Sequence, residues 1–128
     1  MAEAEVVLLA WLNADVDGVR FCTELPADLA DVLPVVQVTR IGGTDDGQFS
    51  VYDNALMDFD CYAATRSAAR TLAEQIRTSI RTGLPGQKVG TDAFVIRCRS
   101  LTGPSWTPYE NTAVRRFTYT AEVRIHSI

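Results

Sequence analysis

Lysine, histidine and cysteine are scarce in this sequence of 128 residues, and each scarcity argues against a class of protein. A metal-dependent nuclease usually needs a lysine or histidine near its acidic residues, and this sequence offers only Lys88 and His126. Three cysteines at wide spacing argue against a disulfide framework and a zinc ribbon, and they favour a reducing compartment. The net charge of −4 differs from the basic surplus that a general nucleic-acid binder usually carries.

Long hydrophobic runs are also missing. No apolar run reaches the roughly 20 residues of a membrane span. The first apolar run follows acidic residues and no basic region, unlike a signal peptide. We therefore expect no membrane contact. A chain of this length fits one domain, residues 1–128, which can bury a core without a metal or a disulfide.

Periodic apolar patterns are present and predict two helices and four strands. The helices cover residues 3–13 and 65–82, and the strands cover residues 35–41, 55–63, 93–101 and 114–128. Three of the strands alternate apolar and polar residues, which favours a largely antiparallel sheet with one covered face. We predict an α+β fold: a two-layer, mostly antiparallel four-stranded sheet with helices packed on one face, in the order helix-strand-strand-helix-strand-strand.

The second helix has the clearest pattern. Thr65 is a good N-cap, and Leu72, Ile76 and Ile80 form a stripe at helical spacing. We expect this stripe to pack on the sheet face carrying Phe59, Cys61, Phe94, Ile96, Phe117 and Tyr119. For the first helix, we expect the shared apolar face to contain Val6, Val7, Leu9, Ala10 and Leu12.

Residues 42–54 contain two adjacent glycines and two adjacent aspartates, and we predict a long loop between two strands. No Gly-Lys-Ser/Thr follows, as a P-loop requires, and the spaced oxygen ligands of an EF-hand are absent. Without chemistry to host, the loop is interpreted as an assembly element, with Gly43, Asp45 and Asp46 as its candidate contacts.

Residues 102–113 predict a second long loop, which contains two prolines, Trp106 and Tyr109. Aromatic residues on such a loop often anchor a partner. Packing of these two side chains back onto the domain is the alternative, and the sequence leaves both open.

Arginines mark the polar side of the later strands. Cross-strand ion pairs with Asp58, Asp60 and Glu122 can be formed by Arg97, Arg99, Arg116 and Arg124. The same arginines, with Arg115, can instead form a charged docking surface for another subunit. The abundance of arginine itself fits either protein interfaces or the codon usage of a GC-rich genome.

Two carboxylates on one strand face raise an enzymatic alternative. Asp58 and Asp60 could bind Mg²⁺ as in a nuclease, or belong to a solvated or interface face. Cys61 and Cys98 are expected on apolar faces, so a catalytic dyad with His126 is not expected. We predict no catalysis and no cofactor.

Three stretches carry a resemblance to a known family: "LPVVQVTRIGG", "FDCYAATRSAARTLAEQI" and "NTAVRRFTYTAEVRIH". In this order they resemble the tail terminator, or tail-completion, proteins of siphophages, particularly those that infect actinobacteria. The resemblance spans most of the chain from about residue 20 onward. None of the three stretches is a catalytic signature.

The resemblance implies a structural role in the virion. It implies a homohexameric ring at the head-proximal end of the tail, assembled in the bacterial cytoplasm. Its partners would be other copies of itself, the tail tube protein and a head-side connector or stopper, with DNA passing through the lumen without specific binding. Another head–tail connector or a minor tail protein is the alternative. The candidate assembly residues are Gly43, Asp45, Asp46, Arg97, Arg99, Trp106, Tyr109, Arg115 and Arg116.

Overall fold

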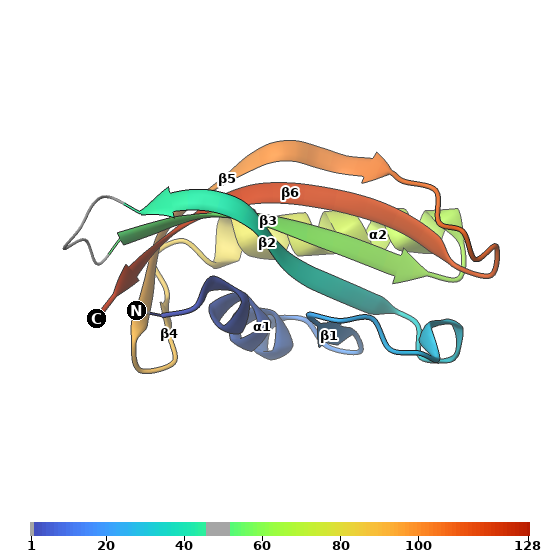
Figure 1. Cartoon of the computed structure of the whole chain (residues 1–128), viewed down its shortest axis with the longest axis horizontal. Helices are drawn as coiled ribbons and strands as arrows, with labels where there is room; N and C mark the ends of the chain where they lie inside the picture. The colour runs from blue at the N-terminus through green and yellow to red at the C-terminus, as the bar shows by residue number, and fades with distance from the viewer. Residues whose placement is uncertain (1, 46–51) are drawn as a thin grey trace.

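The computed structural model describes residues 2–45 and 52–128, and within these residues two α-helices accompany six β-strands (Figure 1). The elements are α1 Ala4–Asp15, β1 Arg20–Cys22, β2 Val35–Asp45, β3 Tyr52–Ala63, α2 Arg66–Thr78, β4 Lys88–Val89, β5 Ala93–Trp106 and β6 Arg115–Ser127. Short helical turns cover Leu29–Asp31 and Ser79–Gly83. The predicted α+β class is confirmed.

The described strands form one curled sheet in the order β1-β2-β3-β6-β5-β4. β1 runs parallel to β2, and the other neighbouring pairs are antiparallel. The predicted four-stranded sheet and its element order are therefore wrong by two strands, β1 and β4. These strands have three and two residues, too few to show an alternating pattern in the sequence.

One main hydrophobic core joins both helices to the sheet. Leu8 of α1 and Ile76 of α2 belong to the same buried cluster as Phe59 of β3 and Tyr119 of β6. α1 packs beside β1 and β2, whereas α2 packs under β3, β6 and β5. The uncovered face of the sheet carries the polar residues of β3 and β6.

The prediction for α2 is confirmed in detail. The Thr65 hydroxyl accepts a hydrogen bond from the Ala68 amide at 3.1 Å, which caps the helix. Leu72, Ile76 and, in the following turn, Ile80 are buried in the main core. The alternation in β3 and β6 is also confirmed, because Phe59, Cys61, Phe117 and Tyr119 are buried there.

The predicted face of α1 is wrong in part. α1 buries Ala4, Val7, Leu8 and Leu12, whereas the Val6 side chain is 59% exposed. Nine of the twelve residues in "AEVVLLAWLNAD" are apolar, so apolar side chains occur on every side of the helix. The sequence pattern consequently could not indicate which side meets the sheet.

The predicted facing of β5 is wrong for Phe94 and Ile96, whereas Cys98 packs against the main core as predicted. Ala93 and Val95 are buried, Phe94 is half-buried opposite His126, and Ile96 is exposed. A register shift between Val95 and Arg97 leaves Ile96 without a partner on β6. This β-bulge reverses the inward and outward alternation, which a strictly periodic reading cannot follow.

The two predicted loops are shorter than expected because the strands extend into them. β2 continues through Gly43 to Asp45, and β3 begins at Tyr52. Asp46, one of the candidate contacts, lies outside the described residues. β5 continues to Trp106, so the second connection covers only residues 107–114.

A second, smaller core lies at one end of the sheet. Tyr62 points to the opposite face from Phe59, yet it is buried against Leu29, Val35 and Val114. The segment between β1 and β2 covers this part of the sheet. The sequence pattern had assigned Tyr62 to the polar face.

Candidate assembly surfaces

The end of β2 requires glycine at position 43. Gly43 has a φ of 112°, and a Cβ atom there would lie 1.9 Å from the Asn54 carbonyl oxygen. A side chain at this position would have to displace the neighbouring strand β3. The Asp45 backbone pairs with Asp53, so Gly43 and Asp45 are parts of a strand.

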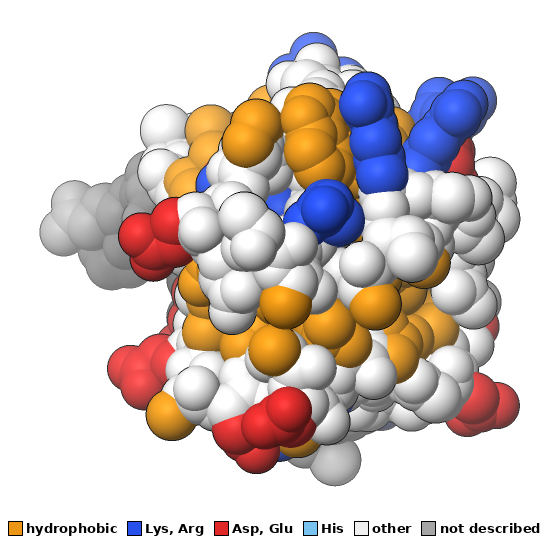
Figure 2. Space-filling model, turned by 90° about the vertical axis from the view of Figure 1, so that its right-hand side faces the viewer, with side chains coloured by type: hydrophobic (Ala, Val, Ile, Leu, Met, Phe, Trp, Pro, Cys, Tyr) orange, Lys and Arg blue, Asp and Glu red, His pale blue; other side chains and the backbone are white. Residues whose placement is uncertain are grey.

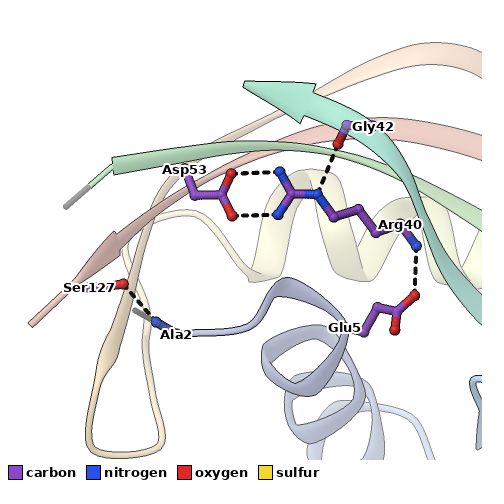
Figure 3. Close-up of polar contacts among 6 residues, drawn as sticks. All are labelled: Ala2, Glu5, Arg40, Gly42, Asp53 and Ser127. Atoms are coloured by element: carbon purple, nitrogen blue, oxygen red, sulfur yellow. Dashed lines mark hydrogen bonds and ion pairs between the residues drawn. The ribbon is translucent and has the colours of Figure 1, made fainter. Parts of the chain in front are cut away.

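Arg40 fastens this strand end to the rest of the domain (Figure 3). Its guanidinium donates to both carboxylate oxygens of Asp53, at 2.6 and 2.7 Å, and to the Gly42 carbonyl at 3.0 Å. Its backbone amide donates to the Glu5 carboxylate of α1 at 2.9 Å. Nearby, the Ala2 amide donates to the Ser127 hydroxyl at 2.8 Å. Sequence reasoning missed this group because its members are far apart in the chain.

Trp106 lies at the opposite end of the sheet and packs back onto the domain. Its ring meets Phe117 edge-on, with 5.6 Å between ring centroids. The Arg66 guanidinium, at the start of α2, stands 4.7 Å from the centre of the same ring. Trp106 is half-buried, and its contacts with Phe117 and Arg66 fix the position of its ring at the surface.

Tyr109 packs back at the same end. Its ring meets Tyr62 edge-on at 5.2 Å between centroids, and the Arg116 guanidinium lies 5.3 Å from its centre. Arg116 also donates to the carbonyls of Thr107 at 3.3 Å and Pro108 at 3.1 Å. The guanidinium therefore holds the connection between β5 and β6 in place.

Arg115 serves the same connection by donating to the carbonyl oxygens of Thr112 and Val114. The fold thus brings Trp106, Tyr109, Arg115 and Arg116 together at one end of the sheet. Gly43 and Asp45 lie at the other end, because the β3–β6 register runs from Tyr52 opposite His126 to Ala63 opposite Arg115.

Arg97 and Arg99 lie on the edge strand β5, where the strand register places them level with Thr44 and Gly42 of β2 across the sheet. Arg99 pairs with Glu122 at 3.5 Å but remains 67% exposed, and Arg97 is exposed beside Arg124. β4 pairs only with Ala93 and Phe94. Among the described strands, none pairs with β5 along its outer side from Ile96 to Trp106. This long open edge is a potential contact surface.

The two carboxylates of the nuclease alternative are engaged within the sheet. Asp58 accepts a hydrogen bond from the Thr120 hydroxyl, and Asp60 accepts one from Thr118, each at 2.6 Å. These threonines, rather than arginines, satisfy the two aspartates. Within residues 2–45 and 52–128, no group of three His, Cys, Asp or Glu side chains could hold a metal ion.

The cysteine thiols are deactivated by burial. Burial raises the pKa of Cys61 well above its usual value and raises the pKa of Cys98 to about 12. For Cys22, burial raises the pKa and the nearby Arg20 partly offsets it. Thiolate, the nucleophilic form, is therefore disfavoured at neutral pH. His126, in turn, stacks on Tyr52 at 4.8 Å between ring centroids.

A mostly apolar groove of about 540 Å³ separates α2 from the segment that follows α1. Its lining includes Val19, Leu33, Ala63, Ala68 and Leu72. In the end view of Figure 2, exposed apolar atoms form a band across this part of the molecule. Lys and Arg side chains gather above the band, and Asp and Glu side chains lie beside and below it. None of the described helices is long and apolar enough to cross a membrane.

The chain has detectable relatives at the level of family and fold. A family model described as "Phage tail termination protein" matches residues 1–127. A solved structure titled "Virion of native gene transfer agent (GTA) particle" is similar with a TM-score of 0.64 and 17% sequence identity, over 96% of this chain and 94% of that chain. At this identity the likeness shows a shared fold alone. No curated protein matches the chain.

Proposed function

The chain belongs to the phage tail termination protein family, and on that premise we propose that it forms a ring that caps the tail tube. The ring stops tube polymerisation and provides the attachment surface for the head. The carrying observation is the family match, which extends over residues 1–127 rather than over a fragment. Residues 1–128 act as one domain in this proposal.

The family is one of structural tail proteins, which supports a role without catalysis. Two features of the described residues are consistent with that role. The carboxylates of Asp58 and Asp60 are bonded to threonines, and burial raises the pKa of Cys61 and Cys98. No cofactor is required for capping a tube.

A ring at a tail end needs contacts to its own copies, to the tube and to the head. We assign the tube and head contacts to the two ends of the sheet. The residues assigned to one end are Trp106, Tyr109, Arg115 and Arg116, and those assigned to the other are Gly43 and Asp45, together with Asp46, which lies outside the described residues. Arg97 and Arg99 on the open edge of β5 contact a neighbouring copy.

DNA passes through the ring without specific binding in this proposal. The net charge of −4 supports it, because a protein of negative charge does not attract phosphates over its whole surface. The ring occupies the head-proximal end of a siphophage tail, as in phages of actinobacteria, and assembles in the host cytoplasm. A tail tube protein and a head-side connector or stopper are its partners.

Genetic complementation tests the proposal. A phage that lacks this gene is grown in host cells that express the chain, and tail lengths and head attachment are scored by electron microscopy. We expect tails of uniform length joined to heads. Overlong tubes detached from heads, despite normal expression of the chain, would contradict a terminator function.

Two controls separate the alternatives. A connector on the head side would bind purified heads that contain the portal rather than tail tubes, whereas a terminator binds tubes. A nuclease would degrade DNA with Mg²⁺ and lose this activity in Asp58→Ala/Asp60→Ala. We expect the wild-type chain to leave DNA intact in the presence of Mg²⁺.

A further inference from the structure

Acidic and basic residues are divided unevenly between the two halves of the sequence. Residues 1–63 contain twelve acidic and two basic residues, whereas residues 64–128 contain four acidic and ten basic residues. The first half therefore carries a formal charge of −10 and the second +6, which together make the net charge of −4. Such an asymmetry acts on binding only if the fold keeps the two halves apart.

The sheet order keeps them apart. The first half of the sequence forms α1 and the strands β1-β2-β3, and the second half forms α2 and the strands β6-β5-β4. In Figure 1, β5 lies at the top of the molecule, and α1 and β1 lie at the bottom; of the second half, the short strand β4 also lies low, beside α1. Figure 2 shows the resulting separation, with basic side chains above the apolar band and acidic ones mostly below it.

The upper side, here called the basic side, combines one flank of α2 with the open edge of β5. Because Arg66 stands over Trp106 of β5, the arginine flank of α2 faces that strand. The opposite flank of α2, with Thr71 and Gln75, lines the groove on the α1 side. The basic side consists of Arg66, Arg70, Arg77 and Arg81 of α2 and Arg97 and Arg99 of β5.

Most of this positive charge is not neutralised within the described part of the chain. Arg77 pairs with Glu74, and Arg99 pairs with Glu122. Arg70, Arg81 and Arg97 are exposed and form no ion pair there.

The lower side, here called the acidic side, extends over α1 and the segment between α1 and β2. Arg20 is the only basic residue among residues 1–39. No ion pair joins the exposed acids of this side to a base in the described residues. The acidic side consists of Glu3, Asp15, Asp17, Glu24, Asp28 and Asp31.

Each side also exposes aliphatic side chains. On the acidic side, Val6 of α1 is 59% exposed. On the basic side, Ile96 is 36% exposed and Leu101 is 43% exposed, and both lie where the β5–β6 register shifts. Apolar contact between two such surfaces would bury these side chains, while their charges remain complementary.

We propose that the acidic side of one copy binds the basic side of the next copy, and that this repeated contact closes the ring. The inference rests on the proposed function, because a ring of identical subunits needs two different, complementary surfaces on each subunit. A two-fold symmetric dimer would instead place each surface against itself and oppose like charges. Complementary charges also fix the register between subunits and speed their encounter.

Paired charge reversals test this contact. The first variant, Arg70→Glu/Arg81→Glu/Arg97→Glu, makes the basic side acidic. The second variant, Asp17→Arg/Glu24→Arg/Asp28→Arg, makes the acidic side basic. All six residues are exposed, so each variant should keep the melting profile of the wild-type chain. Assembly of each variant alone, and of their equimolar mixture, is followed by analytical ultracentrifugation.

Each variant alone should assemble about a hundred-fold more weakly than the wild type, because several attractions become repulsions at every contact. The equimolar mixture should regain assembly, since every contact then joins an acidic to a basic surface. Assembly of the wild-type chain should weaken as salt concentration rises. Assembly of either variant at wild-type strength, a mixture that stays unassembled, or a wild-type chain that remains monomeric would each overturn the proposal.

Two further arms complete the test. If a triple variant loses its melting transition, the single changes Arg97→Glu and Asp28→Arg repeat the mixing experiment with smaller expected changes. Complementation of the gene-deficient phage separates this inference from the proposed function. A wild-type chain that does not restore tail length contradicts termination, whereas reversed variants that restore it as well as the wild type contradict only the assignment of the two sides.

Discussion

The two helices of this domain contrast in how their sequences relate to their surroundings. α2 has one apolar stripe, a Thr65 side-chain cap and a polar exterior, and it lies as its pattern predicts. α1 is apolar on every side, has no side-chain cap, and exposes Val6 while burying Leu8. A sequence pattern identifies the buried face of a helix only where the helix has a single apolar face.

This difference suggests that the two helices have different roles. α2 completes the core and presents arginines outward. α1 completes the core as well, but its outward side keeps aliphatic residues that a solvent-exposed helix does not need. We interpret this outward side of α1 as part of the contact with a neighbouring copy. The predictions below test this contrast.

The largest expected difference between the helices is in core packing. Ile76→Ala on α2 should lower the free energy of unfolding by about 2–5 kcal/mol, because it leaves a cavity beneath the sheet. Val6→Ala on α1 should change it by less than about 0.5 kcal/mol, because that side chain is exposed. Urea denaturation measures both. Equal losses for the two variants would show that the outward side of α1 is buried in the monomer.

A buried polar group joins the helices and provides the next test. The Trp11 indole N–H donates to the Ser79 hydroxyl at 3.0 Å, and Ser79 donates to the Asp15 carboxylate. Ser79→Ala should cost about 1–3 kcal/mol by leaving the indole N–H without its acceptor. The exposed neighbour Thr78 is the matched control, and Thr78→Ala should stay within about 0.5 kcal/mol of the wild type. Thermal denaturation distinguishes the two outcomes.

The helix caps should differ by a smaller amount. Thr65→Ala removes the hydrogen bond to the Ala68 amide and should cost about 1 kcal/mol. Glu3 occupies the corresponding position of α1 without a side-chain hydrogen bond, so Glu3→Ala should have little effect on stability. The comparison requires chemical denaturation of both variants under identical conditions. An equal cost at both positions would contradict the assigned caps.

The smallest expected effect concerns the first turn of α2. A double-mutant cycle of Arg66→Ala and Trp106→Phe should show a coupling energy of about 0.5–1 kcal/mol from the stacked guanidinium. The same cycle with Arg70 in place of Arg66 should show coupling near zero. Coupling of similar size in both cycles would mean that the arginine flank acts through its general charge.

Only part of the candidate assembly surface could be predicted from the sequence. The residue types of Trp106, Tyr109 and the paired arginines drew attention to one end of the domain. Their arrangement around Tyr62 and Phe117 depends on a loop folding back over the sheet, and no periodic pattern encodes it. The Arg40–Asp53 contact was missed because it depends on strand pairing across a connection.

The sequence by itself determined the α+β class, the position and face of α2, and the alternation of β3 and β6. These features depend on interactions between near neighbours and on one dominant apolar face, which periodicity records. Only the tertiary structure decided the short strands β1 and β4, the outward side of α1 and the bulge at Ile96. It also turned a charge difference along the chain into two opposite surfaces, because strand order, which is set by pairing between distant segments, decides where each half of the chain lies.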